Sequence, residues 1–168
     1  MNVGGAGMAT RPRDDLLVDI ERYLRAHHTM TIATRDPVSE HPHAAHVFYA
    51  VDEGLRLVFL SRLTSLHGKH IGKESRVAAT VSEEYQDWQL IKGVQIWGTA
   101  CLLRGKAKTG ALALYLKQFP FVSELISSPG SLHGLRGIGV YRLEPDGLGL
   151  TDNTAGVFGR ETLDLDGD

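Results

Sequence analysis

The polar segment from Ser61 to Ser65, with the sequence Ser-Arg-Leu-Thr-Ser, is the first place in the chain where residue types and spacing point to chemistry. Hydroxyl groups and backbone N–H groups at the start of a helix bind phosphate and other anions. The same pattern is also typical of a turn between a strand and a helix, in which Thr64 or Ser65 only caps the helix. Taken by themselves, these residues favour the capping role.

Eight histidines raise the question of a metal or haem site. His41 and His43 are two residues apart at the start of an expected strand and share one face of it, whereas His46 faces the other way. His67 and His70 are three residues apart in an expected helix, so they can also share a face. A metal ion would still need a third ligand, and the sequence has no HExxH motif. We therefore predict no metal site.

Further candidates lie in one long alternating strand. Trp97 is expected to wall a cofactor site or to pack in a barrel or dimer interface, both of which suit an aromatic residue. Gln95 carries an amide that would bond the edge of a ring or face solvent. Cys101, on an apolar strand, is expected to be an inert buried thiol. The sequence has no Ser-His-Asp order, no nucleophile elbow and no Walker loop.

Hydrophobic periodicity and turn signals place these candidates on a small set of elements. Helices are expected over residues 14–27, 64–73 and 109–118. Strands are expected over residues 29–34, 43–51, 55–61, 76–82, 94–104, 137–143 and 147–151. Six or seven strands with two or three short helices in mixed order predict a mostly β, antiparallel barrel with helical covers, not a doubly wound parallel sheet.

The length of 168 residues suits one domain with short appendages. We expect residues 1–13 to be a flexible lead-in without the apolar core of a signal peptide, 14–155 to form the domain, and 156–168 to form a C-terminal tail. A net charge of -2 gives no field that would attract nucleic acid or an anionic membrane. No apolar run approaches the roughly 20 residues that span a bilayer. The single cysteine fits a reducing, cytoplasmic location.

The order of several segments resembles the flavin-binding split-barrel family of the pyridoxamine 5'-phosphate oxidase type. The segments that carry the resemblance are TMTIATRDP, HPHAAHVFYAVDEG, LRLVFLSRLTS, SRVAATVSEE and GVQIWGTACLL, within residues 16–153. Each motif is short, so their order and spacing carry the specificity. The resemblance implies an antiparallel split barrel of six or seven strands and a homodimer with flavin mononucleotide (FMN) sites between the subunits. The later segment DNTAGVFGR resembles small uncharacterised members of the family rather than the vitamin B6 oxidase.

The resemblance also implies which residues hold the flavin. The ring would lie along the strand residues His46, Val47, Phe48 and Tyr49. The phosphate would be held by Leu60, Ser61, Arg62, Thr64 and Ser65. The second subunit would contribute Gln95 and Trp97. Where the oxidases carry an Arg-Lys pair after the serine, this chain has Leu66 and His67, so Arg62, His67 or Lys69 would have to replace the missing charge.

These features predict an FMN-dependent oxidoreductase that exchanges hydride or electrons with a small molecule. His46 and Tyr49 are the candidate catalytic residues because they lie on the strand expected to face the ring. One alternative is a non-catalytic protein of the same fold that binds flavin, haem or a deazaflavin. A further alternative is a barrel that has lost its cofactor and serves another reaction in a biosynthetic pathway.

Overall fold

The computed structural model of the chain describes residues 11–127, 137–155 and 159–165. The first ten residues of the expected lead-in therefore lie outside the described residues, as do residues 156–158 and 166–168 of the expected tail. The helices are α1 (Arg13–Ala26), α2 (Leu66–Ile71), η1 (Trp88–Leu90), α3 (Gly105–Gln118), α4 (Pro120–Ser127) and η3 (Asn153–Ala155). The strands are β1 (Thr29–Arg35), β2 (Pro42–Val51), β3 (Leu57–Arg62), β4 (Glu74–Ser82), β5 (Lys92–Leu102), β6 (Ile138–Asp152) and β7 (Arg160–Asp164).

The strands form one antiparallel sheet that closes on itself. Its order is β3-β2-β1-β4-β5-β6-β7, and β3 also pairs with β6, so the first six strands in this order make a barrel that β7 extends. The larger apolar cluster, which includes Ile32, Phe59 and Ile96, fills the barrel. This arrangement confirms the predicted antiparallel split barrel with a few short covering helices.

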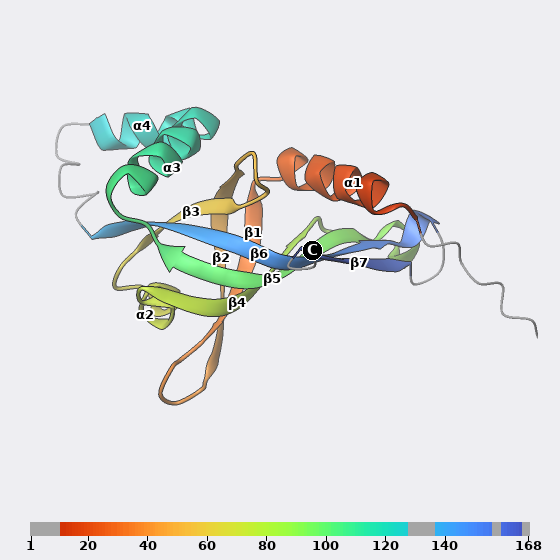
Figure 1. Cartoon of the computed structure of the whole chain (residues 1–168), viewed down its shortest axis with the longest axis horizontal. Coiled ribbons are helices and arrows are strands. Elements are labelled where there is room, and N and C mark those ends of the chain that lie inside the picture. The colour runs from red at the N-terminus through yellow and green to blue at the C-terminus, as the bar shows by residue number, and fades with distance from the viewer. Residues whose placement is uncertain (1–10, 128–136, 156–158, 166–168) are drawn as a thin grey trace, which may run out of the picture.

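Helices cover only part of the outside of the barrel. α1 contributes Leu16, Ile20 and Leu24 to the main core, and α3 contributes Tyr115 to a second cluster over β3 and β6. In Figure 1, α1, α3 and α4 lie above the barrel and α2 lies below it. None of these helices is long and apolar enough to cross a membrane, a statement that holds for the described ranges.

The structure differs from the sequence-based elements near the C-terminus. The two strands expected over residues 137–143 and 147–151 form a single strand, β6. A register shift between Trp97 and Gly98 of β5 accommodates Pro145, so the pairing of β5 with β6 continues past the proline. A further helix that the sequence did not predict, α4, follows α3 and begins at Pro120. Proline is well tolerated in the first turn of a helix. The segment Arg160–Asp164, expected to belong to the tail, pairs with β6 as β7.

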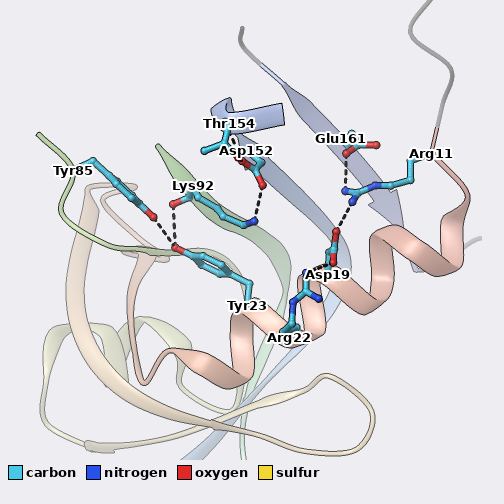
Figure 2. A network of polar contacts seen from close by, with 9 residues as sticks. All are labelled: Arg11, Asp19, Arg22, Tyr23, Tyr85, Lys92, Asp152, Thr154 and Glu161. Carbon is cyan, nitrogen blue, oxygen red and sulfur yellow. Dashed lines mark hydrogen bonds and ion pairs between the residues drawn. The ribbon is translucent and has the colours of Figure 1, made fainter. Parts of the chain in front are cut away.

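A network of polar contacts fastens α1 to the end of the sheet, as Figure 2 shows. The Tyr23 hydroxyl donates to the main-chain oxygen of Lys92 at 3.0 Å, and the Lys92 ammonium bonds Asp152 at 2.6 Å. Arg11, just before α1, bridges Asp19 of that helix and Glu161 of β7. α1 therefore depends on contacts with strands from the opposite end of the sequence.

We expect Asp152→Asn to lower the free energy of unfolding by about 1 kcal/mol at neutral pH, since the pair with Lys92 is partly exposed. Partial burial disfavours the charged carboxylate, but hydrogen bonds from Lys92 and Thr154 outweigh it and lower the pKa of Asp152. A lowered pKa stabilises the fold above the unfolded pKa, and this contribution disappears as the pH falls through the folded pKa. Urea unfolding should therefore show the two proteins converging in acid. Asp164→Asn, at an exposed position of β7, is the control, and an equal loss in both variants would contradict the role of the pair.

Candidate functional site

The barrel has a split where β2 and β3 separate. Their pairing consists of Tyr49 with Phe59, Ala50 with Val58 and Val51 with Leu57. Beyond this point, the rest of β2 pairs only with β1, and the end of β3 pairs only with β6. Two strand edges therefore face each other without a shared hydrogen-bond ladder.

Backbone groups of β2 point into this split. The N–H of Tyr49 donates to the carbonyl of His28 at 2.9 Å, on the side of β2 away from β3. Because backbone polar groups alternate in direction along a strand, those of Phe48 and His46 face the opposite side, toward β3. The split thus offers backbone donors and acceptors, as expected for a site that binds the edge of a polar ring.

A hydroxyl-lined turn follows the end of β3. The Ser61 hydroxyl lies 3.0 Å from the Ser65 hydroxyl and 2.5 Å from Nε2 of His67. Ser65 also caps α2 by accepting a bond from the Gly68 N–H at 3.1 Å. The capping role favoured by the sequence is therefore confirmed, and the same residue belongs to a cluster of polar groups.

The turn packs too tightly for a side chain at Gly68. A Cβ there would lie 2.5 Å from the Arg62 carbonyl oxygen, 2.9 Å from the Ser65 hydroxyl and 3.0 Å from the Tyr141 hydroxyl. The Tyr141 hydroxyl is buried and has no hydrogen-bond partner in the described structure. The turn therefore lies directly on the barrel interior, and its shape depends on glycine.

Three histidines gather between α2 and β2. The ring of His43 lies 6.1 Å from that of His67 and 5.9 Å from that of His70. The imidazole of His70 is fixed between the Thr34 hydroxyl at 3.1 Å and the Asp36 carboxylate at 3.6 Å. Burial, together with the charges of His43 and His70, lowers the pKa of His67. Across the described residues, no group of three or more histidine, cysteine or acidic residues is arranged to hold a metal ion.

The outer face of β2, β1, β4 and β5 carries a different set of residues. Nδ1 of His46 lies 2.7 Å from the Thr31 hydroxyl, and both side chains point away from the barrel interior. Trp97 lies flat against Gly147, where a Cβ would come within 2.3 Å of the indole ring. Two rows cross the four strands in register: His46, Thr31, Thr80 and Gln95 form one, and Ala44, Ala33, Ala78 and Trp97 form the other.

The predicted cofactor residues fall into five groups. Ser61, Ser65 and His67 contact one another, and Arg62, Thr64 and Lys69 are exposed around them. His46, Phe48, Gln95 and Trp97 lie on the outer face of the sheet. Val47 and Tyr49 belong to the main core, where the Tyr49 hydroxyl donates to the Leu24 carbonyl at 2.7 Å, and Leu60 packs against the second cluster.

The sequence did not predict His43 and His70 as part of the cofactor site. The sequence signal that could have found them is that His41 and His43 share one face of a strand, while His67 and His70 share one face of a helix. Nothing in the sequence says that this strand face and this helix face meet. Cys101 agrees with expectation, since it is a free, partly buried thiol whose pKa burial raises.

A cavity of about 410 Å³ lies away from these residues. It opens between α3 and the turn that joins β2 to β3, and its lining includes Arg25, Arg56, Ala111 and Arg142. None of the predicted cofactor residues lines it. The split is the candidate functional site because Ser61, Ser65, His67 and His43 lie close together at its end. The arginines of the cavity already pair with Glu21, Asp52 and Glu144.

Comparison with known proteins gives consistent results. The family model for pyridoxamine 5'-phosphate oxidase matches residues 18–134. A UPF0306 protein from Klebsiella pneumoniae subsp. pneumoniae is 31% identical over 150 residues, which cover 88% of this chain and 91% of that protein.

Two solved structures share the fold at low sequence identity. A heme binding protein from Mycobacterium smegmatis has a TM-score of 0.68 at 18% identity, and the match covers 93% of this chain but only 60% of that one. A FAD-binding protein from Mesorhizobium loti has a TM-score of 0.59 at 16% identity, over 78% of this chain and 90% of that one.

We expect Gly68→Ala to destabilise the protein by about 1–3 kcal/mol, the usual cost of overpacking, because the nearest atom to the new methyl group is a fixed backbone oxygen. Gly110→Ala is the matched control, since a Cβ at that helical position meets nothing within 4 Å. This control should be neutral or slightly stabilising because alanine is the better helix former. Denaturant unfolding of both variants checks the difference, and a neutral Gly68→Ala would refute the close packing of the turn.

Proposed function

The chain belongs to the pyridoxamine 5'-phosphate oxidase family, and we propose that it is an FMN-dependent oxidoreductase whose flavin lies along the split between β2 and β3. The observation that carries the proposal is the end of the β2–β3 pairing at Tyr49 and Phe59, together with the hydroxyl turn that follows β3. Bound FMN would supply the hydride and electron transfer, and the protein would bind it, orient it and exclude water.

The turn fits the phosphate end of the cofactor. Ser61 and His67 offer a hydroxyl and an imidazole within 2.5 Å of each other, and Ser65 holds Ser61 from the other side. Glycine at position 68 lets the turn pack closely, because a Cβ there would clash with the Arg62 carbonyl oxygen and the Ser65 hydroxyl. The two fixed cations of the segment, Arg62 and Lys69, are exposed and can reach an anion only from the solvent side.

The neighbouring part of β2 fits a flavin ring, which needs apolar walls and a few directed hydrogen bonds. Backbone groups of His46 and Phe48 face the split and supply the hydrogen bonds. The Phe48 ring packs against Phe119 and Phe121 at centroid distances of 5.4 and 5.9 Å and supplies an apolar wall.

His46 is the stronger of the two candidate residues for handling a proton. Its ring is exposed and its Nδ1 is held by Thr31, which fixes the orientation of the imidazole. The Tyr49 hydroxyl is buried and already donates to a backbone carbonyl, and burial raises its pKa. A proton delivered to a ring on the split would therefore come from His46 or from solvent.

A second copy of the chain would complete the site. On the sheet, β2 is separated from β5 by β1 and β4, so Gln95 lies about 14 Å from His46 and cannot share a ring with it within one subunit. The outer face that carries both residues includes the exposed alanines Ala33, Ala44 and Ala78. Such a flat, small-residue surface suits close packing against an identical face in a homodimer.

Haem is the second candidate. The likeness to the Mycobacterium smegmatis heme binding protein favours it, as does the exposed imidazole of His46 beside the split, because histidine is a common axial ligand of haem iron. This alternative requires no phosphate partner.

We expect FMN added to the purified protein to give a yellow complex that survives gel filtration. Ser61→Ala should weaken FMN binding about 10- to 150-fold, the effect of losing one hydrogen bond to a charged group. Riboflavin, which lacks the phosphate, should bind both proteins equally. Ser82→Ala, at an exposed position of β4, is the control. A protein that ignores both flavins but gives a Soret band with hemin would replace the first proposal with the second.

We expect the protein to be a dimer in solution, and Ala33→Arg to make it monomeric because two large cations would meet at the middle of the alanine row. The matched control is Ala107→Arg, at an exposed position of α3 outside this face. Light scattering after gel filtration measures the mass. A monomeric wild type, or a dimer unaffected by Ala33→Arg, would contradict this arrangement.

A further inference from the structure

We propose that Ser61, His67 and the adjoining histidines form a proton-dependent anion site, in which protonated His67 supplies the charge that a fixed lysine or arginine would otherwise supply. The proposal rests on the proposed function because the anion is taken to be the phosphate of FMN. The chemistry itself belongs to this chain's own imidazoles.

The donors are already in place for an oxyanion. Nε2 of His67 and the Ser61 hydroxyl lie 2.5 Å apart, and each has no other hydrogen-bond partner in the described structure except Ser65, which bonds Ser61. Ser65 in turn is fixed by the Arg62 carbonyl and the Gly68 N–H. A phosphate that accepts from both His67 and Ser61 would replace one bond between neutral groups with two charge-assisted ones.

Only one of the three clustered histidines has a carboxylate partner. His70 has a counter-ion, because the Asp36 carboxylate lies 3.6 Å from its Nε2. Within the described residues, His43 and His67 have no carboxylate within ion-pair distance. His67 is only 9% exposed, so an imidazolium there would be a largely buried cation without an anion. Such a charge is costly to bury and needs a counter-ion from outside the chain.

Anion binding and protonation are therefore coupled. Burial, together with His43 and His70, keeps the pKa of His67 low when the site is empty. A bound phosphate offsets these effects and favours the imidazolium, so each binding event takes up a proton near neutral pH. By linkage, the affinity for phosphate falls as the pH rises.

Other titratable groups surround the cluster and set its background field. The elements that pack against α2 are β1, β2, β4 and β5. The ionisable residues on these elements near α2, on the adjoining ends of β3 and β6, and on α2 itself are Arg35, Asp36, His41, His43, Arg62, Lys69, His70, Lys73, Glu74, Arg76, Cys101 and Tyr141. Of these, Asp36 is the only acid shown within ion-pair distance of a cluster histidine, and it pairs with His70.

The test compares FMN with riboflavin between about pH 7 and 9, above the second pKa of the phosphate itself, which is about 6. Quenching of flavin fluorescence gives the affinity at each pH. We expect FMN binding to weaken about tenfold per pH unit toward the alkaline end, the slope for one linked proton. Riboflavin binding should show no such slope. Calorimetry in buffers of different ionisation enthalpy should show proton uptake with FMN only.

Variants locate the proton. His67→Gln keeps a group that can bond Ser61 but does not titrate, so it should bind FMN weakly and without the slope. His67→Lys introduces a fixed charge and should bind FMN more tightly than the wild type at the alkaline end, again without the slope. His41→Gln removes an exposed histidine just outside the cluster and should keep the wild-type slope.

Two results would overturn the proposal while the flavin function survives: pH-independent FMN affinity in the wild type, or an unchanged slope in His67→Gln. If neither flavin binds, the proposed function fails separately. Inorganic phosphate then tests the anion site in the wild-type protein, through the imidazole resonances of His67. A saturable shift that raises the pKa of His67 supports the site, and no shift refutes it.

Discussion

The pairing of β2 with β3 stops at Tyr49 and Phe59, and the rest of the site depends on this interruption. Tyr49 is fixed at the point of separation by its backbone bond to His28 and by its hydroxyl bond to Leu24. Because β3 continues along β6 while β2 continues along β1, the barrel remains closed overall but leaves two unpaired edges. A strand edge is usually a liability that proteins cover. Here α2 packs against β2, and the proposed flavin would lie along the edge that β2 leaves unpaired with β3.

The two faces of β2 carry different groups of polar residues. Inward-facing His43 joins the histidines of α2 at the end of the barrel, whereas outward-facing His46 lies on the exposed sheet with Thr31. A cofactor on the split would have its charged end near the first group and its ring near the second. The site thus combines a compact polar cluster, whose charge depends on protonation, with an open surface that a second subunit would cover. The shape of this cluster depends on Gly68, where the turn has no room for a side chain.

Membership of the family narrows the range of functions but does not identify the cofactor. Members of one fold differ in the few residues that meet the ligand, so the site and not the fold must decide. This chain keeps the hydroxyls of the turn but places His67 where a permanent charge would be expected. If the chain binds FMN as proposed, that exchange would cost affinity in alkaline conditions and make binding responsive to pH. A haem ligand would make no use of the turn, which is why the comparison of FMN with riboflavin separates the two readings of the site.

The sequence by itself determined the fold class and most of the elements, because alternation in strands such as Lys92–Leu102 and helical spacing in Arg13–Ala26 are local properties. It also located the hydroxyl turn and limited the helix cap to Thr64 or Ser65, of which the structure selects Ser65. It could not show that His43 meets His67 and His70, since that contact joins a strand to a helix more than twenty residues away in the chain. It also missed β7, a short strand that is stable only because β6 offers an edge to it. Local periodicity can be recognised from the order of the residues alone. Contacts between faces of elements that are distant in the sequence form only when the barrel closes.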